Sequence, residues 1–170
     1  RRAARRGGRG GGFAQGAGAG DPVAGVRAAE GLDAGAREAI ARWTRLPEAT
    51  CVFAPQAAGS SYRLRMFSPQ KEVPFAGHPS VGTAHAVLQA GLAAPVEGVL
   101  VQDGIAGLLP LQVIGEGAGQ RIAIRTPRAQ LAETAQADDP RLQAALQGWP
   151  TGELPPARMQ GGRSWWVVQV

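Results

Sequence analysis

The stretch that decides the fold is residues 72–84, which read Glu-Val-Pro-Phe-Ala-Gly-His-Pro-Ser-Val-Gly-Thr-Ala. Its first half is apolar and interrupted by proline and glycine, which is typical of an irregular lead into a helix. Pro79 suits the first helical position, because its missing N–H would have no partner there. Gly91 is expected to end this helix. One helical face is predicted to hold Val81, Ala84, His85 and Leu88.

The start of this helix carries the first candidate functional groups. First-turn N–H groups have no acceptor inside the helix, so together with the helix dipole they can hold an anion. Gly77 lets a ligand approach the backbone closely, and Ser80 belongs to the same turn, so both are substrate-binding candidates. His78 could hydrogen-bond a carboxylate or shuttle a proton. The alternative is a histidine whose ring is satisfied within a helix cap.

The residues before this helix predict another helix and two strands. Asp33 is a fair N-cap, and its helix should end near Leu46, because Pro47 disfavours helical geometry in the residue before it. Short strands are predicted over 50–53 and 62–67, the second from its alternation of polar and apolar residues. The residues that recur at helical spacing are Ala36, Ala39, Ile40 and Trp43.

Glu48 lies in the turn between that helix and the first of these strands. Its neighbours along the chain include Leu46, Val52 and Phe53, so its carboxyl is expected in apolar surroundings. Desolvation disfavours the charged form of a carboxyl, which would make Glu48 a usable general acid and base near neutral pH. The alternative is a surface glutamate in a turn, and local sequence alone does not decide between the two.

The remainder of the chain predicts more strands, one short helix and a linker. The strands are expected over 99–101, 107–113 and 121–124. The helix is expected over 139–146. Residues 147–162 hold three prolines and four glycines, which is typical of a linker. A β-prone run begins at Trp165 and reaches the last residue of the sequence.

The charge of the chain is concentrated at its start. The formal net charge is +5, and Arg1, Arg2, Arg5, Arg6 and Arg9 account for all of it. Residues 1–20 are otherwise mostly glycine and alanine, and they are expected to be disordered because they cannot bury enough surface to offset their ordering entropy. This tail has no aromatic side chain before Phe13 on which a base could stack, so no specific nucleic-acid partner is expected. The alternative is a genuine nucleic-acid-binding arm, since a basic tail can hold phosphates nonspecifically.

Cysteine content and apolar patterning narrow the class of protein. Cys51 is the only cysteine, which excludes an internal disulfide and a cysteine-rich zinc site, and it is expected to be a buried packing residue. No apolar run reaches the length of a membrane span, and no continuous apolar stretch follows the first arginines. A cytoplasmic protein with no membrane segment and no signal peptide is the resulting expectation.

Taken in order, these pieces resemble a known family. Leu-x-Glu-x-Thr at 46–50 precedes Arg-x-Arg-x-Phe-x-Pro at 63–69, and the stretch at 72–84 follows. This order resembles the PhzF-like family of cofactor-independent isomerases, and the resemblance runs roughly from Gly20 to the end of the chain. It implies an α+β fold like that of diaminopimelate epimerase. In that fold a curved, mostly antiparallel sheet or barrel wraps around a central helix, and the ligand cleft lies between two such domains.

The resemblance also implies roles for residues of this chain. Glu48 matches the family's acid/base glutamate, which in the phenazine enzyme moves a proton on dihydro-hydroxyanthranilate, and His78 matches the site histidine. Gly77 matches a position that helps to hold the substrate. Asp21 stands where the family has the asparagine of a Gly-Asn-Pro motif that lines the cleft, so a hydrogen-bond donor is lost and a charge is gained. No metal or other cofactor is implied, and the expected ligand is a small carboxylated substrate.

Members of this family are longer than this chain and carry a second domain that completes the cleft. The expected organisation is therefore a disordered tail at 1–20, an N-terminal domain at 21–146, and a linker with the first strand of a truncated second domain at 147–170. The expected function is a PhzF-like isomerase that is inactive as this fragment alone. A homodimer or a complementing C-terminal half is the expected protein partner. The alternative is a truncated or decayed non-catalytic copy that acts at most as an interaction module.

Overall fold

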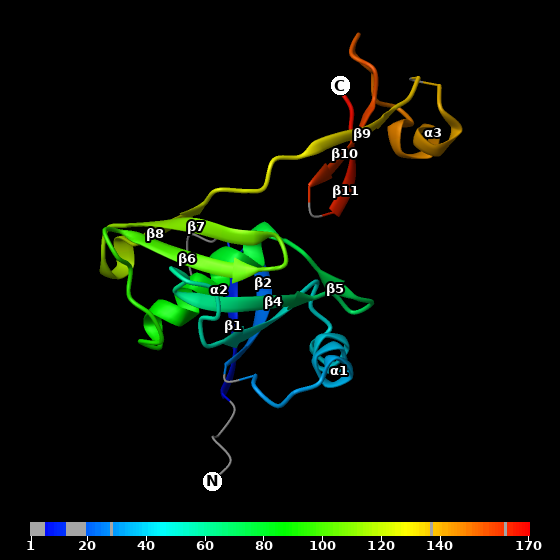
Figure 1. The fold of residues 1–170 in the computed structure, drawn as a ribbon. Helices are drawn as coiled ribbons and strands as arrows, with labels where there is room; N and C mark the ends of the chain where they lie inside the picture. The colour runs from blue at the N-terminus through cyan, green and yellow to red at the C-terminus, as the bar shows by residue number, and fades with distance from the viewer. Residues whose placement is uncertain (1–5, 13–19, 28, 137, 162) are drawn as a thin grey trace. The chain divides into compact units, whose positions relative to one another are not determined.

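The computed structural model describes residues 6–12, 20–27, 29–136, 138–161 and 163–170. They fall into two compact units, Arg1–Thr126 and Pro127–Val170 (Figure 1). The division after residue 126 differs from the expected domain end at residue 146. The division falls earlier because residues 130–134 pair with residues 157–161 in one sheet, which joins them to the second unit.

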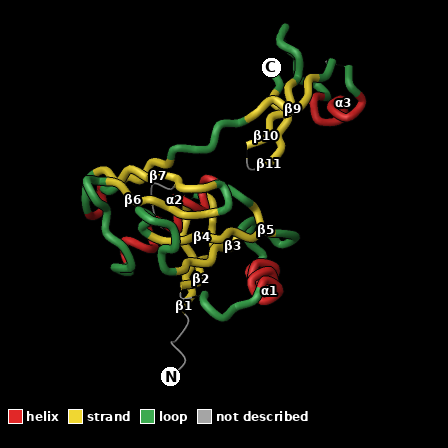
Figure 2. The backbone as a smooth tube through the Cα atoms, in the orientation of Figure 1, coloured by secondary structure: helices red, strands yellow, loops and turns green. Residues whose placement is uncertain are grey.

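The first unit is one curled, mostly antiparallel sheet around helix α2 (Gly77–Gln89), in agreement with the expected fold class (Figures 1 and 2). Its strands are β1 (Arg6–Gly12), β2 (Asp21–Arg27), β3 (Ala49–Phe53), β4 (Tyr62–Phe67), β5 (Glu72–Val73), β6 (Val99–Gly104), β7 (Gly107–Ile114) and β8 (Arg121–Ile124). Their spatial order is β1-β2-β3-β4-β6-β7-β8, with β5 paired to β4. Among the described residues of this sheet, only the pairs β2–β3 and β4–β6 are parallel. Helix α2 contacts both β1 and β8, the two edges of the sheet, so the sheet wraps around the helix.

Strand β3 is buried on both faces, and its partner β4 alternates between buried and half-buried positions, which places both strands at the centre of the unit. The alternation predicted for β4 is confirmed, because its apolar residues at every second position are buried. One core cluster lies between the sheet and α2 and contains Val52, Tyr62, Leu64, Met66, Ala84 and Val87. A second cluster lies beneath helix α1 (Ala34–Thr44) and contains Ala24, Ala41, Ala49, Cys51 and Phe67.

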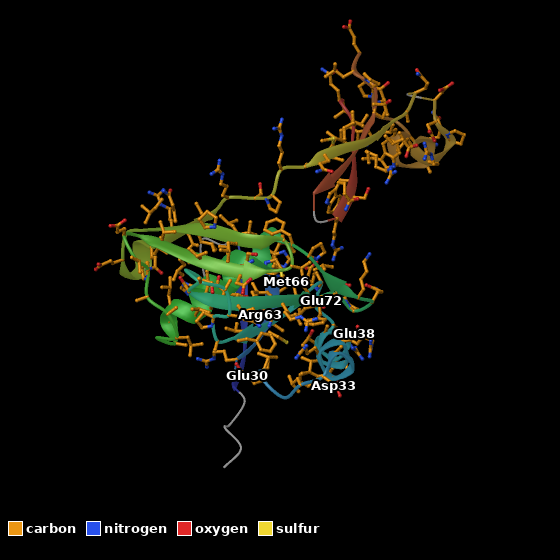
Figure 3. The ribbon with its side chains drawn as sticks, viewed as in Figure 1. Glu30, Asp33, Glu38, Arg63, Met66 and Glu72 are labelled. Carbon is orange, nitrogen blue, oxygen red and sulfur yellow. The ribbon has the colours of Figure 1, made fainter. Side chains whose placement is uncertain are left out.

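Helix α1 begins where the sequence predicts, but it buries a different face. The Asp33 side chain, labelled in Figure 3, accepts a hydrogen bond from the amide of Ala36 at 2.7 Å and so caps the helix. The predicted face is wrong, since Trp43 is 80% exposed and Ala41 is fully buried. Small residues line the sheet beneath α1, so an alanine allows the close approach that a tryptophan would prevent.

Helix α2 ends near the predicted glycine, and here too the predicted face is rotated. Gly91 has a φ of 63°, and the amide of Leu92 reaches back to the carbonyl of Val87, which closes the helix end. His85 is exposed whereas Ala84 is buried, so the predicted face that holds both of them is wrong. The buried positions of the helix are Pro79, Ser80, Gly82, Thr83, Ala84 and Val87. Small hydroxyl residues thus occupy part of the face that the apolar pattern assigned to larger side chains.

Part of the tail expected to be disordered is a strand. Residues 6–12 form β1, which pairs antiparallel with β2 from Arg6 opposite Arg27 to Gly12 opposite Asp21. Main-chain hydrogen bonds need no side chain, so a glycine-rich segment can complete the edge of a sheet whose neighbouring strand has unpaired backbone groups. Residues 1–5 and 13–19 of the expected tail lie outside the described residues.

The second unit is a three-stranded antiparallel sheet with one short helix. Its strands, in spatial order, are β11 (Arg163–Val167), β10 (Ala157–Gly161) and β9 (Gln130–Thr134), and the helix is α3 (Pro140–Leu146). Strand β10 corrects the expected linker, because partners on both sides hold a segment of weak β propensity in the sheet. Among the described residues, no helix is long and apolar enough to cross a bilayer.

The buried thiol gives a prediction for the core beneath α1. Burial raises the pKa of Cys51 from 9.0 to about 11, so almost no thiolate is present at neutral pH. We expect the folded chain at pH 8 to react with an aromatic disulfide reagent more slowly than the denatured chain, by a factor of about 100 or more. Equal rates in the folded and denatured chain would show that Cys51 is accessible.

The same shift predicts how stability changes at alkaline pH. The folded-state pKa lies above the unfolded value, so the contribution of the buried thiol to the free energy of unfolding is complete below about pH 9 and declines toward pH 11. Urea titrations across this range should show the decline, and Cys51→Ala should flatten it. An unchanged slope in Cys51→Ala would assign the decline to other groups.

Candidate active site

Glu48 is held at the point where the chain enters β3. Helix α1 ends at Arg45, whose left-handed backbone with a φ of 55° turns the chain toward the strand. The backbone carbonyl of Glu48 accepts a hydrogen bond from the amide of Ala24 on β2, at 3.5 Å. The Glu48 side chain is only 5% exposed. It is therefore buried, a question that the local sequence left open.

His78 lies in the first turn of α2 and approaches Glu48. The distance from His78 Nε2 to Glu48 Oε2 is 3.5 Å, and the His78 side chain is 15% exposed. Within the described residues Nε2 makes no hydrogen bond. This ring nitrogen can therefore interact with a ligand or with a proton carried by the carboxyl. We call Glu48 and His78 the site pair.

The N-terminus of α2, beside the site pair, has no side-chain cap. Ala76 is the N-cap residue with an extended backbone, and it offers no side-chain acceptor. Pro79 has no N–H, so the amides of Gly77 and His78 are first-turn donors without an acceptor inside the helix. Together with the positive end of the helix dipole, these two donors can bind a carboxylate next to the site pair.

Two other predicted residues are placed differently. Ser80 is fully buried, and its hydroxyl donates to the carbonyl of Ala76 at 3.0 Å, so it closes the first turn of the helix. Asp21 is exposed at the first position of β2. It precedes Ala24 by three residues, which in a strand is about 10 Å. Asp21 therefore lies further along β2 than Ala24, whose amide holds the backbone carbonyl of Glu48, and its role in substrate binding stays a prediction.

Sequence reasoning missed two threonines that join the segments carrying the site pair. The Thr83 hydroxyl donates to Thr50 Oγ1 at 2.9 Å, and the Thr50 hydroxyl donates to the carbonyl of Ala24 at 3.3 Å. Both threonines are buried. The motifs contain a usable signal, because a threonine follows Glu48 by two residues and His78 by five. Two residues of a strand and five of a helix advance by similar lengths.

The segment leading into α2 is anchored by an ion pair. The Arg65 guanidinium on β4 makes two hydrogen bonds to the carboxylate of Glu72, which is labelled in Figure 3 on β5. Glu72 raises the pKa of Arg65, chiefly through this hydrogen bonding, so the arginine stays charged. Between them, the Ser68 hydroxyl oxygen accepts hydrogen bonds from the amides of Gln70 and Lys71. The Arg-x-Arg-x-Phe-x-Pro segment thus fixes the path of the chain toward α2.

A surface groove of about 260 Å³ is lined by Gln56, Arg63, Arg65 and their neighbours, and neither residue of the site pair lines it. Its two arginines already have partners, because Arg63 hydrogen-bonds to Gln56 and Arg65 to Glu72. We therefore place the candidate site by the chemistry of the site pair and not by the size of this groove.

Comparison with known proteins supports the resemblance noted in the sequence. The family model for phenazine biosynthesis-like proteins, PhzC-PhzF, matches residues 11–170. The Schizosaccharomyces pombe protein called Antisense-enhancing sequence 1 is 32% identical over 155 residues, which are 89% of this chain and 52% of that protein. The trans-2,3-dihydro-3-hydroxyanthranilate isomerase of Pseudomonas aeruginosa is 43% identical over 68 residues, which are 40% of this chain and 24% of the enzyme. The chain thus spans about half the length of the yeast relative.

A solved structure shares the fold. The PhzF-family phenazine biosynthesis protein of Bacillus anthracis superposes with a TM-score of 0.73 at 24% identity. The superposition covers 94% of this chain and 54% of the Bacillus chain. At this identity the match supports the architecture and does not by itself transfer an activity.

The proximity within the site pair can be tested by NMR, because the chain has only two histidines. We expect Glu48→Gln to shift the ring signals of His78, because replacing a carboxyl group 3.5 Å from Nε2 by an amide changes the surroundings of the ring. His85 is the internal control, since it is exposed and lies about 10 Å further along the helix. Unchanged His78 signals, or equal shifts at both histidines, would contradict the contact.

Proposed function

The chain belongs to the PhzC-PhzF family of phenazine biosynthesis-like proteins, and from that premise we propose that it is the N-terminal part of an isomerase. Its reaction moves a proton between carbon atoms of a small carboxylated substrate. In this proposal Glu48 is the acid/base group, and His78 with Gly77 positions the substrate. The relatedness to a hydroxyanthranilate isomerase supports the reaction class.

The observation that carries the proposal is a buried carboxyl beside a histidine at an uncapped helix start. Glu48 and His78 come from different elements, and their side-chain atoms approach to 3.5 Å. A surface glutamate in a turn would have been mostly exposed. The adjacent Gly77 amide offers a binding point for a substrate carboxylate, which would hold a reacting carbon near Glu48.

One carboxyl group is sufficient for the proposed proton transfer. Glu48 as the carboxylate takes a proton from one carbon, the electron pair of that C–H bond shifts into the substrate's π system, and a double bond moves. The resulting glutamic acid then returns the proton to a second carbon, which regenerates the carboxylate. The step is neither an oxidation nor a reduction, and no proton is gained or lost overall.

The buried thiol is not part of this mechanism. Racemases with this type of fold use a pair of cysteines, and this chain has only Cys51. Its side chain is packed beneath α1, in the cluster that contains Ala41, and its raised pKa keeps it protonated. The carboxyl of Glu48 is therefore the acid/base group that we assign.

The catalytic role of Glu48 can be tested in a completed enzyme. We suggest joining residues 1–170 to the C-terminal half of the Pseudomonas aeruginosa isomerase, so that both walls of the proposed cleft are present. With trans-2,3-dihydro-3-hydroxyanthranilate in heavy water, we expect deuterium to enter the product, and we expect Glu48→Gln to lower this exchange by about 100-fold or more. The amide keeps the shape of the side chain and cannot act as an acid or base.

The matched control is Glu38→Gln on α1, where the glutamate pairs with Arg42 on the surface and is remote from the mechanism. This variant should exchange at the parent rate. Circular dichroism should show that both variants are folded. Exchange at the parent rate in folded Glu48→Gln would show that Glu48 is not the base.

We also propose that the 170-residue chain alone is inactive. The aligned part of the chain covers 52% of the Schizosaccharomyces pombe relative, and catalysis needs groups fixed on both sides of the substrate. The assay should use the whole chain, because a truncation at residue 21 would remove β1 from the sheet. If the completed protein also shows no exchange, the alternative of a non-catalytic interaction module is favoured.

A second proposal concerns the protein partner, and it rests on the sheet of the second unit. Leu131, Met159 and Trp165 are cross-strand neighbours on β9, β10 and β11, so they share one face. Leu131 is 60% and Trp165 62% exposed. Exposed apolar faces of this kind favour association, either with a second copy or with a complementing half.

We therefore expect the isolated chain to self-associate, with a mass in solution above that of a monomer. Trp165→Lys should lower this association, because it places a charge on the apolar face. Trp149→Lys is the control, since Trp149 is equally exposed but lies outside the strands. Sedimentation over a range of concentrations provides the measurement, and a monomer at every concentration would refute the proposal.

A further inference from the structure

We infer that Thr50 and Thr83 are positioning residues that hold the site pair in its working geometry through a hydroxyl–hydroxyl bond between β3 and α2. This inference rests on the proposed function, since it assigns the two threonines to the same site. It concerns neither substrate contact nor proton transfer. The threonines act through the backbone segments that carry Glu48 and His78.

A series of hydrogen bonds connects helix α2 through strand β3 to the backbone of Glu48. Thr83 donates to Thr50, and Thr50 donates to the carbonyl of Ala24. The amide of the same Ala24 donates to the backbone carbonyl of Glu48. The position of α2, and with it the position of His78, is therefore linked to the backbone of Glu48 by three successive hydrogen bonds.

The direction of the Thr83 hydroxyl shows that it links two elements. A serine or threonine inside a helix commonly donates to the carbonyl four residues earlier, and Ser80 does so toward Ala76 in this same helix. Thr83 instead donates across to Thr50 at 2.9 Å. Both threonines are β-branched and stiff at χ1, so the bond fixes the separation of the two backbones better than a flexible side chain would.

Burial makes this bond sensitive to substitution. Thr50 is fully buried and Thr83 is 3% exposed, so water cannot readily replace a lost partner. Valine has nearly the shape of threonine but lacks the hydroxyl, so Thr83→Val removes the link while keeping the packing. Serine keeps the hydroxyl but lacks the methyl group. The comparison of valine with serine therefore separates the link from the packing.

The first experiment uses the whole 170-residue chain and needs no activity. We expect Thr83→Val to shift the ring signals of His78 and to leave those of His85 unchanged, and we expect Thr83→Ser to restore the parent signals. In urea unfolding, Thr50→Val and Thr83→Val should each reduce the folding equilibrium constant about fivefold. The double variant should be less destabilised than the sum of the two predicts, because both remove the same bond.

A second readout in the completed enzyme separates positioning from binding. Thr83→Val should lower kcat for deuterium exchange by about ten- to hundredfold with little change in KM, because the substrate still binds while the base is displaced. Thr83→Ser should recover most of kcat. If Thr83→Val does not fold, Thr83→Ala and Thr83→Ser provide the same comparison, since they differ only in the hydroxyl.

The outcomes distinguish this inference from the proposed function. If Thr83→Val is less stable but leaves the His78 signals and kcat at parent values, the bond is only structural and the inference is wrong. An active parent with an inactive Glu48→Gln variant would leave the proposed function intact in that case. If Glu48→Gln exchanges at the parent rate but the His78 signals follow the hydroxyl of Thr83, the proposed base is wrong and the positioning of the pair stands.

Discussion

The structure depends on the register between strand β3 and helix α2. Three successive levels join them: Glu48 with His78, Thr50 with Thr83, and Val52 in one core cluster with Ala84 and Val87. Two residues of a strand advance by about 6.6 Å, and five residues of a helix advance by about 7.5 Å. These two lengths are similar enough for β3 and α2 to make polar contacts at the end near Glu48 and apolar contacts at the end near Val52. A shift of β3 by one residue would turn Glu48 to the opposite face.

This register requires a helix that can approach the sheet closely. Gly82, Thr83 and Ala84 are consecutive buried residues of α2, and all three are small. Small residues at these positions allow the surrounding sheet to approach the helix, and a larger residue at Thr83 would push the helix away from β3. Close approach also requires small residues between α1 and the sheet. Here Ala41 of α1 packs over Ala49 and Cys51 on the outer face of the sheet. Small side chains on both faces of β3 keep both helices near the strand.

The sequence predicted the structural features that depend only on residues close together in the chain. The Asp33 cap, the alternation of β4 and the end of α2 at Gly91 follow from short-range hydrogen bonding and backbone preference, and all three are confirmed. The helix faces were mispredicted, because alanine-rich helices have no unique apolar stripe and the sheet beneath selects the face. Strands β1 and β10 were missed because their pairing comes from neighbouring strands and not from their own residues. The placement of Glu48 near His78 followed from a resemblance, whereas the threonine link required the register of two elements and so could not be seen in one segment.

The contacts that join β3 to α2 differ from the contact between Glu48 and His78. At 3.5 Å the contact between Glu48 and His78 is longer than a strong charge-assisted hydrogen bond, so it contributes little to holding the segments together. The shorter Thr83–Thr50 bond joins the same two elements, and the Arg65–Glu72 ion pair joins β4 to β5, the strand that leads into α2. The Thr83–Thr50 bond carries no charge, so the proton transfer that we propose for Glu48 leaves this bond unchanged. A neutral link between β3 and α2 suits the role that we propose for Glu48, because the charge of an acid/base group changes during each turnover and a threonine hydroxyl stays uncharged.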